Sequence, residues 1–176
     1  MLTSPDYESI ILYRKREGEQ TMNIEIKNAM LNHYMKNSAA SHYIIGFNMN
    51  HTIFMVNATD EDLKDITTVE KAGHNDGYAL KFKPNKDIKT YLLAKGATAL
   101  CSELYFEQTV QASKYNRGEI FEKMVTEYNG QKWTKDNINY RVQGDIRVND
   151  TEIQIKYEKA TFITEGQIQR EREKDL

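Results

Sequence analysis

Apolar and polar positions alternate most regularly over residues 142–157. A period of two residues is typical of strands that bury one face. The two alternating runs are separated only by Asn149-Asp150, and a connection of that length predicts a tight hairpin. Centred on this loop, the register places Asp145 opposite Gln154 and Gln143 opposite Lys156.

This register gathers a carboxylate, a carboxamide and an ammonium group on one face of the hairpin, those of Asp145, Gln154 and Lys156. Carboxylate and amide oxygens are hard ligands that suit Mg²⁺ or Mn²⁺. A bound metal would polarise a phosphate, and a neighbouring ammonium would stabilise the developing charge. The pattern favours phosphodiester chemistry. An ordinary half-buried hairpin carries the same residue types on its wet face, so a structural role stays open.

A helix is predicted upstream, over residues 115–128. Asn116 is a candidate N-cap, and Glu119 three residues later completes a capping-box pattern. Glu122 borders the apolar stripe of this helix, whereas Glu119 projects nearly opposite it. We therefore expect Glu122, rather than Glu119, to reach a metal on the sheet. The stripe consists of Ile120, Phe121, Met124, Val125 and Tyr128.

The order Glu122, Gly144-Asp145, Gln154-Ile155-Lys156 resembles the PD-(D/E)XK nuclease superfamily in its Gln-x-Lys variant. The resemblance covers about the last third of the chain. It implies a restriction-endonuclease-like core of helix, β-meander and helix. It also implies that Asp145, Gln154 and the Ile155 carbonyl hold the metal. Glu122 would act on the metal directly or through water, and Lys156 would contact the nucleophile or the phosphate.

Two departures from the family pattern bear on activity. Gly144 stands where the family usually has proline, and Gln154 stands where it usually has glutamate. A neutral amide is a weaker metal ligand than a carboxylate. An inactive protein that keeps only the fold therefore stays an alternative.

The rest of the chain predicts an N-terminal mixed α/β portion. Residues 1–21 are expected to form a polar arm, with Met22 a conceivable second start. The portion at 22–112 would serve recognition or dimerisation, and 113–176 would form the nuclease-like core, in an α/β (α+β) fold overall. We expect helices at 23–35, 87–95, 97–111 and 167–174, a short helix or turn at 60–66, and strands at 42–48, 52–57 and 77–83.

Composition narrows the function classes only a little. The chain has 176 residues and a net charge of −2, so it carries no global basic signature of nucleic-acid binding. An acidic metal site can offset basic residues, so a nuclease is not excluded. Lone Cys101 cannot form an internal disulfide and fits a reducing cytoplasm. No apolar run predicts a membrane span.

Other candidate residues carry weaker signals. The spacings of His42, His51 and His74 are irregular, which favours surface or turn positions over a metal site. Gln167 is a weak candidate for the site. Basic residues interleave with Tyr115 and Trp133, as in a groove that follows a phosphate backbone, although a solvated face is an equal alternative. These basic residues are Lys114, Arg117, Lys132, Lys135 and Arg141.

Three hypotheses follow from the sequence. The first is an Mg²⁺- or Mn²⁺-dependent DNA endonuclease that could pair as a homodimer, with no membrane partner. The second is a nuclease-fold accessory factor of a phage or mobile element that binds nucleic acid or protein without catalysis. The third is a structural domain with a chance motif, in which Asp145, Gln154 and Lys156 would not come together.

Overall fold

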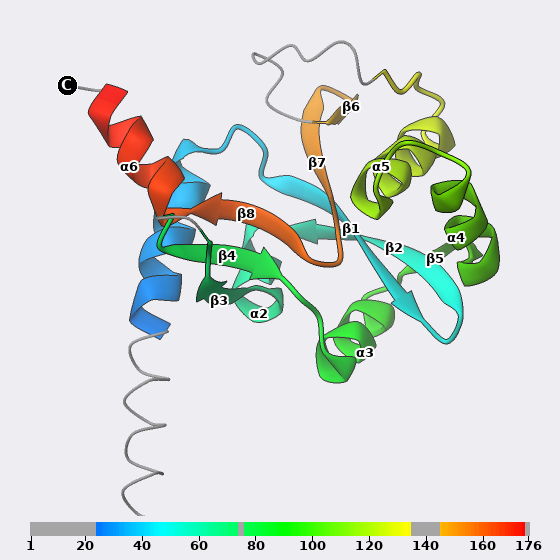
Figure 1. Ribbon diagram of the computed structural model, residues 1–176, viewed down its shortest axis with the longest axis horizontal. Helices are drawn as coiled ribbons and strands as arrows, with labels where there is room; N and C mark the ends of the chain where they lie inside the picture. Colours follow the sequence, from blue (N-terminus) through cyan, green and yellow to red (C-terminus); the bar gives the residue numbers. More distant parts are fainter. Residues whose placement is uncertain (1–23, 74–75, 135–144, 175–176) are drawn as a thin grey trace, which may run out of the picture.

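The computed structural model describes residues 24–73, 76–134 and 145–174. A first helix is described over residues 24–37 and is the unlabelled blue helix of Figure 1. The other elements follow in the order β1 His42–Met49, β2 Thr52–Thr59, α2 Asp60–Ile66, β3 Thr68–Lys71, β4 Tyr78–Phe82, α3 Lys86–Ala94, β5 Thr98–Ser102, α4 Glu103–Gln111, α5 Arg117–Tyr128, β6 Ile146–Val148, β7 Thr151–Tyr157, β8 Ala160–Thr164 and α6 Glu165–Lys174. The fold is mixed α/β.

The larger sheet has five described strands in the order β5-β2-β1-β7-β6. Strand β7 pairs in parallel with β1, whereas the other neighbours are antiparallel. The parallel register places Tyr43 beside Gln154 and Ile45 beside Lys156. The hairpin that carries the candidate residues is therefore anchored on strands from the first half of the chain.

Each face of this sheet packs against a different layer. Ile44, Ile53 and Ile155 point to the face that α4 and α5 cover, where they meet Phe106 and Phe121. Tyr43 and Ile45 point to the opposite face. There the helix at 24–37 and the smaller sheet, β3-β4-β8, complete a second core (Figure 1). The alternation along each strand is what sends its side chains to two cores.

Gly46 sets how closely α5 approaches the sheet. The Phe121 ring lies directly over it, and a Cβ at residue 46 would overlap three atoms of that ring. Phe121 is completely buried. Because Glu122 follows Phe121 on α5, this contact also fixes where the Glu122 backbone lies.

The structure confirms the hairpin. Ile146 pairs with Ile153, Arg147 with Glu152 and Val148 with Thr151, as the predicted register requires. Asn149 and Asp150 have φ values of 50° and 63°. Two successive positive φ angles are the signature of the type I′ turn, which matches the twist of paired strands.

One expectation about the elements is wrong. Residues 97–111 form strand β5 and then helix α4, rather than one helix. Ser102 separates them, because its side chain accepts a hydrogen bond from the Tyr105 amide and so begins the helix. Strands β3 and β8 were not foreseen. The predicted strands at 42–48, 52–57 and 77–83 and the helices at 23–35, 60–66 and 87–95 are confirmed within a few residues.

The expected β-meander is only partly visible. Helix α5, the β6–β7 hairpin, β8 and α6 follow in the expected order. However, β8 pairs with β4 in the smaller sheet instead of extending the sheet of β6 and β7. Residues 135–144, which include Gln143 and Gly144, lie outside the described residues.

Candidate functional site

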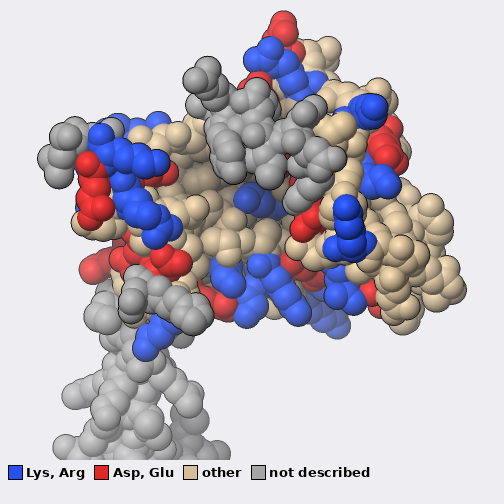
Figure 2. Space-filling view, turned by 45° about the horizontal axis from the view of Figure 1, so that its top comes forward, with Lys and Arg blue, Asp and Glu red and all other residues tan. Residues whose placement is uncertain are grey.

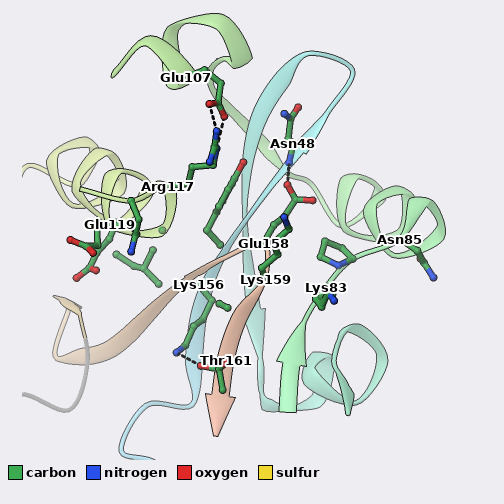
Figure 3. Close-up of a pocket in the computed structure, with 17 residues that line it drawn as sticks. Asn48, Lys83, Asn85, Glu107, Arg117, Glu119, Lys156, Glu158, Lys159 and Thr161 are labelled. Carbon is green, nitrogen blue, oxygen red and sulfur yellow. Dashed lines mark hydrogen bonds and ion pairs between the residues drawn. The ribbon is translucent and has the colours of Figure 1, made fainter. Parts of the chain in front are cut away.

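The hairpin borders a groove of about 910 Å³. Its walls come from the start of α5, the second half of β7, the β7–β8 turn and the β4–α3 connection (Figure 3). Of the residues expected at the nuclease site, Glu122, Ile155 and Lys156 line it, whereas Asp145 and Gln154 do not. Figure 2 shows Lys and Arg side chains gathered across the middle of one face of the molecule.

Asp145 lies just before β6 and turns its side chain along the edge of β7. Its amide donates to the Ile153 carbonyl over 2.9 Å, and its Oδ2 accepts a hydrogen bond of 2.7 Å from the Ile155 amide. The ladder between β6 and β7 ends at Ile146, so among the described residues no strand pairs with this edge of β7 beyond Ile153. An amide and carbonyl of one strand residue point to the same side. The Ile155 carbonyl therefore points to the edge beside the Asp145 carboxylate.

Lys156 lies deep in the same region. Its Nζ donates to the Thr161 carbonyl over 3.0 Å and lies 5.2 Å from the centre of the Phe162 ring. Burial lowers the pKa of this lysine below its usual value, and the charges of Asp145 and Glu122 oppose that shift without overcoming it. The structure thus brings Asp145, Glu122 and Lys156 close enough for their charges to interact.

Gln154 lies on the same face of β7 as Lys156 but is held by a residue that sequence reasoning missed. The Tyr34 hydroxyl, from the helix at 24–37, donates to Gln154 Oε1 over 2.5 Å. Tyr34 also packs edge-on against Phe162, with ring centres 5.5 Å apart. Burial raises the pKa of Tyr34, and the negative charge of Asp145 adds to the increase. Tyr34 therefore belongs to the surroundings of both candidate ligands.

The Tyr34→Phe variant is expected to be less stable than the parent by about 1 kcal/mol, because the change removes the hydroxyl and leaves the Gln154 amide without this partner. Urea unfolding of Tyr34→Phe measures this. Gln154→Leu and the double variant complete a cycle, in which the two single effects should not add. Additive effects would contradict the hydrogen bond.

Helix α5 brings two carboxylates to the groove. Asn116 is the N-cap, since its Oδ1 accepts a hydrogen bond of 2.9 Å from the Glu119 amide. The expected division between a capping Glu119 and a site-facing Glu122 is not visible, because both residues line the groove and both are half-buried. Both glutamates are therefore placed to act on a ligand there.

The basic and aromatic residues before β6 are partly described. Tyr115 and Trp133 pack edge to face with ring centres 5.0 Å apart, and Lys114 Nζ lies 5.4 Å from the Tyr115 ring centre. Arg117 forms two hydrogen bonds to Glu107, of 2.7 and 2.6 Å. Lys135 and Arg141 lie outside the described residues. The aromatic pair and Lys114 form one cluster beside α5.

Gln167 has a structural role at the start of α6. Its Oε1 accepts a hydrogen bond from the Thr164 amide, and its own amide donates to Thr164 Oγ1. This reciprocal pair is a capping arrangement. It satisfies the first amides of α6, and Gln167 does not line the groove.

The described residues hold no group of three or more His, Cys, Asp and Glu side chains arranged as a metal site. The candidate ligands here are instead two carboxylates, an amide and a carbonyl. Within the described ranges, no helix is long and apolar enough to cross a membrane. Comparison with protein-family models, with curated proteins and with solved structures gives no match.

Proposed function

We propose that this protein is a metal-dependent nuclease that hydrolyses DNA phosphodiester bonds. The observation that carries the proposal is the placement of the Lys156 ammonium at the groove within the electrostatic reach of Asp145 and Glu122. An ionisable group with a perturbed pKa in a concavity is a candidate for catalysis. Lys156 is partly buried and donates to a backbone carbonyl, whereas a lysine on an ordinary wet hairpin face would be exposed.

The oxygen donors at the edge of β7 fit Mg²⁺ or Mn²⁺. The Asp145 carboxylate, the Ile155 carbonyl and the Glu122 carboxylate are hard ligands, and the first two lie on the same side of one strand edge. Gln154 Oε1 accepts the Tyr34 hydrogen bond and has a second lone pair for a cation. When bound, the metal would supply Lewis acidity toward the phosphate and the attacking water.

The protein's own groups have distinct roles in this proposal. Asp145 is held by the Ile155 amide, so its carboxylate is oriented before any ligand arrives. Lys156 Nζ donates to the attacking water or to a non-bridging phosphate oxygen, and its lowered pKa makes it a better proton donor than an exposed lysine. Glu122 completes the set from α5. The groove, which Glu122 and Lys156 line, would orient the phosphodiester relative to those two groups.

Loss of metal binding in Asp145→Asn tests the metal site. The change keeps the shape of the side chain but removes its charge, and we expect affinity for Mn²⁺ to fall by about tenfold or more. Titration calorimetry with Mn²⁺ on the full chain measures this. Asp150→Asn, in the exposed turn, is the matched control and should bind like the parent. Equal Mn²⁺ affinity in Asp145→Asn and the parent would contradict the proposal.

The second candidate is a nuclease-fold protein that binds nucleic acid without cutting it. The hydrogen bond from Tyr34 to Gln154 favours it, because that bond engages one of the expected metal ligands. This candidate predicts that divalent metal does not change nucleic-acid binding, and that Asp145→Asn binds nucleic acid as the parent does.

Cleavage of both strands of a duplex would call for two sites related by a two-fold axis, so a homodimer belongs to the first candidate.

A further inference from the structure

The groove has two ends of opposite charge. Glu119 lies on one side of it, whereas Lys83 and Lys159 lie on the other (Figure 3). Two further groove carboxylates already have cationic partners. Glu107 is paired with Arg117 over 2.6 Å, and Glu158 is paired with Lys89 over 2.7 Å. The end formed by the β7–β8 turn and the β4–α3 connection is therefore the cationic one.

Lys83 and Lys159 lie at the same end of the β4–β8 ladder. Phe82 pairs with Ala160 at this end, and the Lys159 amide donates to the Phe82 carbonyl over 2.7 Å. Lys83 follows Phe82, Lys159 precedes Ala160, and both residues line the groove. The ladder therefore brings two lysines to one end of the groove.

Lys159 adopts a backbone conformation that is unfavourable for a lysine. Its φ is 71°, a left-handed conformation that glycine adopts freely and that costs a residue with a Cβ. Among the described residues, no hydrogen bond or ion pair holds its side chain, which is exposed. Lys83 pairs with Glu70 over 3.0 Å, and both side chains are about two-fifths exposed, so that pair contributes little and is readily exchanged. Both ammonium groups are available to an anion in the groove.

We infer that Lys83 and Lys159 form a binding site for the phosphodiester backbone of a nucleic acid, at the end of the groove away from Glu119. A phosphate bound at this end of the groove would be attracted by both ammonium groups. The ligand class rests on the proposed nuclease function, and the site would flank the phosphate that Lys156 contacts. Phosphate contacts of this kind set position and affinity rather than sequence preference.

The Lys159→Gly variant tests the site, because it removes the ammonium and suits the left-handed backbone. We expect Lys159→Gly to unfold at the same temperature as the parent or higher, yet to bind a fluorescein-labelled oligonucleotide about two- to tenfold more weakly. Fluorescence anisotropy is measured in EDTA over a series of salt concentrations. In a plot of the log of the association constant against the log of the salt concentration, the negative slope should become shallower by about 0.9 for a duplex and about 0.7 for a single strand.

Lys64→Ala is the matched control, since Lys64 is exposed on α2 and does not line the groove. It should keep the parent salt slope, and Lys83→Gln should reduce the slope as Lys159→Gly does. A parent protein that binds neither strand form, or a Lys159→Gly variant with the parent slope, overturns the inference. Binding without cleavage in Mg²⁺ would overturn the proposed function alone, because the binding assay contains no metal.

Discussion

The Lys156→Met variant should lose metal-dependent cleavage and gain stability. Methionine has nearly the length of lysine but no charge. Removing a donor that acts on charge developing in the transition state typically costs about 10²–10³ in rate. Burial disfavours the Lys156 ammonium by more than Asp145 and Glu122 favour it, so the variant should also be more resistant to urea at neutral pH.

The pH dependence of this difference has a definite sign. The folded-state pKa of Lys156 lies below the unfolded value of 10.5. Below the folded pKa both states carry the proton, and the cost of burying the charge is present in full. Between the two pKa values the unfolded state binds more protons, so parent stability rises with pH. The advantage of Lys156→Met should therefore shrink as pH rises toward 10.5.

Urea titrations of both proteins from neutral pH to about pH 10 measure this linkage. Lys64→Met is the control, because Lys64 is exposed on α2. A Lys156→Met variant that is less stable than the parent at neutral pH, or a difference that does not change with pH, would contradict a buried ammonium.

Gly46→Ala should destabilise the fold and impair the site together. The added Cβ would overlap the Phe121 ring, which is fully buried and cannot move without displacing α5. Overpacking of this kind costs about 1–3 kcal/mol. Because Glu122 is the next residue on α5, cleavage should fall as well. Chemical denaturation of the full chain measures the first effect.

Two further variants make the packing argument specific. Gly73→Ala should leave stability unchanged, since a Cβ there meets no atom within 4 Å. Phe121→Leu reduces the volume above residue 46, so the double variant Gly46→Ala/Phe121→Leu should lose less than the two single losses combined. Strict additivity, or a Gly46→Ala variant as stable as the parent, would refute the role of this contact.

Local patterns predicted much of the fold. The alternation around Asn149-Asp150 was enough to predict the β6–β7 register, because a two-residue turn leaves few alternatives. Strand β5 was missed because its five residues, Thr98–Ser102, lead directly into α4. The sequence pattern of the two elements together resembles that of one helix. The pairing of β8 with β4 joins segments about eighty residues apart, which no local period reveals.

The candidate site was likewise predicted only where local sequence patterns indicated it. Asp145 and Lys156 followed from their spacing in the hairpin, and Glu122 from the helix stripe. Tyr34 was not predicted as a site residue, since its hydroxyl meets Gln154 across 120 residues. Lys159 gave no signal, because lysine is not a residue that marks a left-handed turn. The long-range Tyr34–Gln154 contact and the left-handed conformation of Lys159 could therefore not be predicted from local sequence patterns.

Cleavage of supercoiled plasmid tests the central claim most directly. The parent protein and Lys156→Met are incubated with plasmid in Mg²⁺ or Mn²⁺ and in EDTA, with single-stranded and branched DNA as further substrates. We expect nicking by the parent that requires the metal and is absent in Lys156→Met. If the parent cuts none of these DNAs, or if Lys156→Met cuts as well as the parent, the nuclease proposal is contradicted.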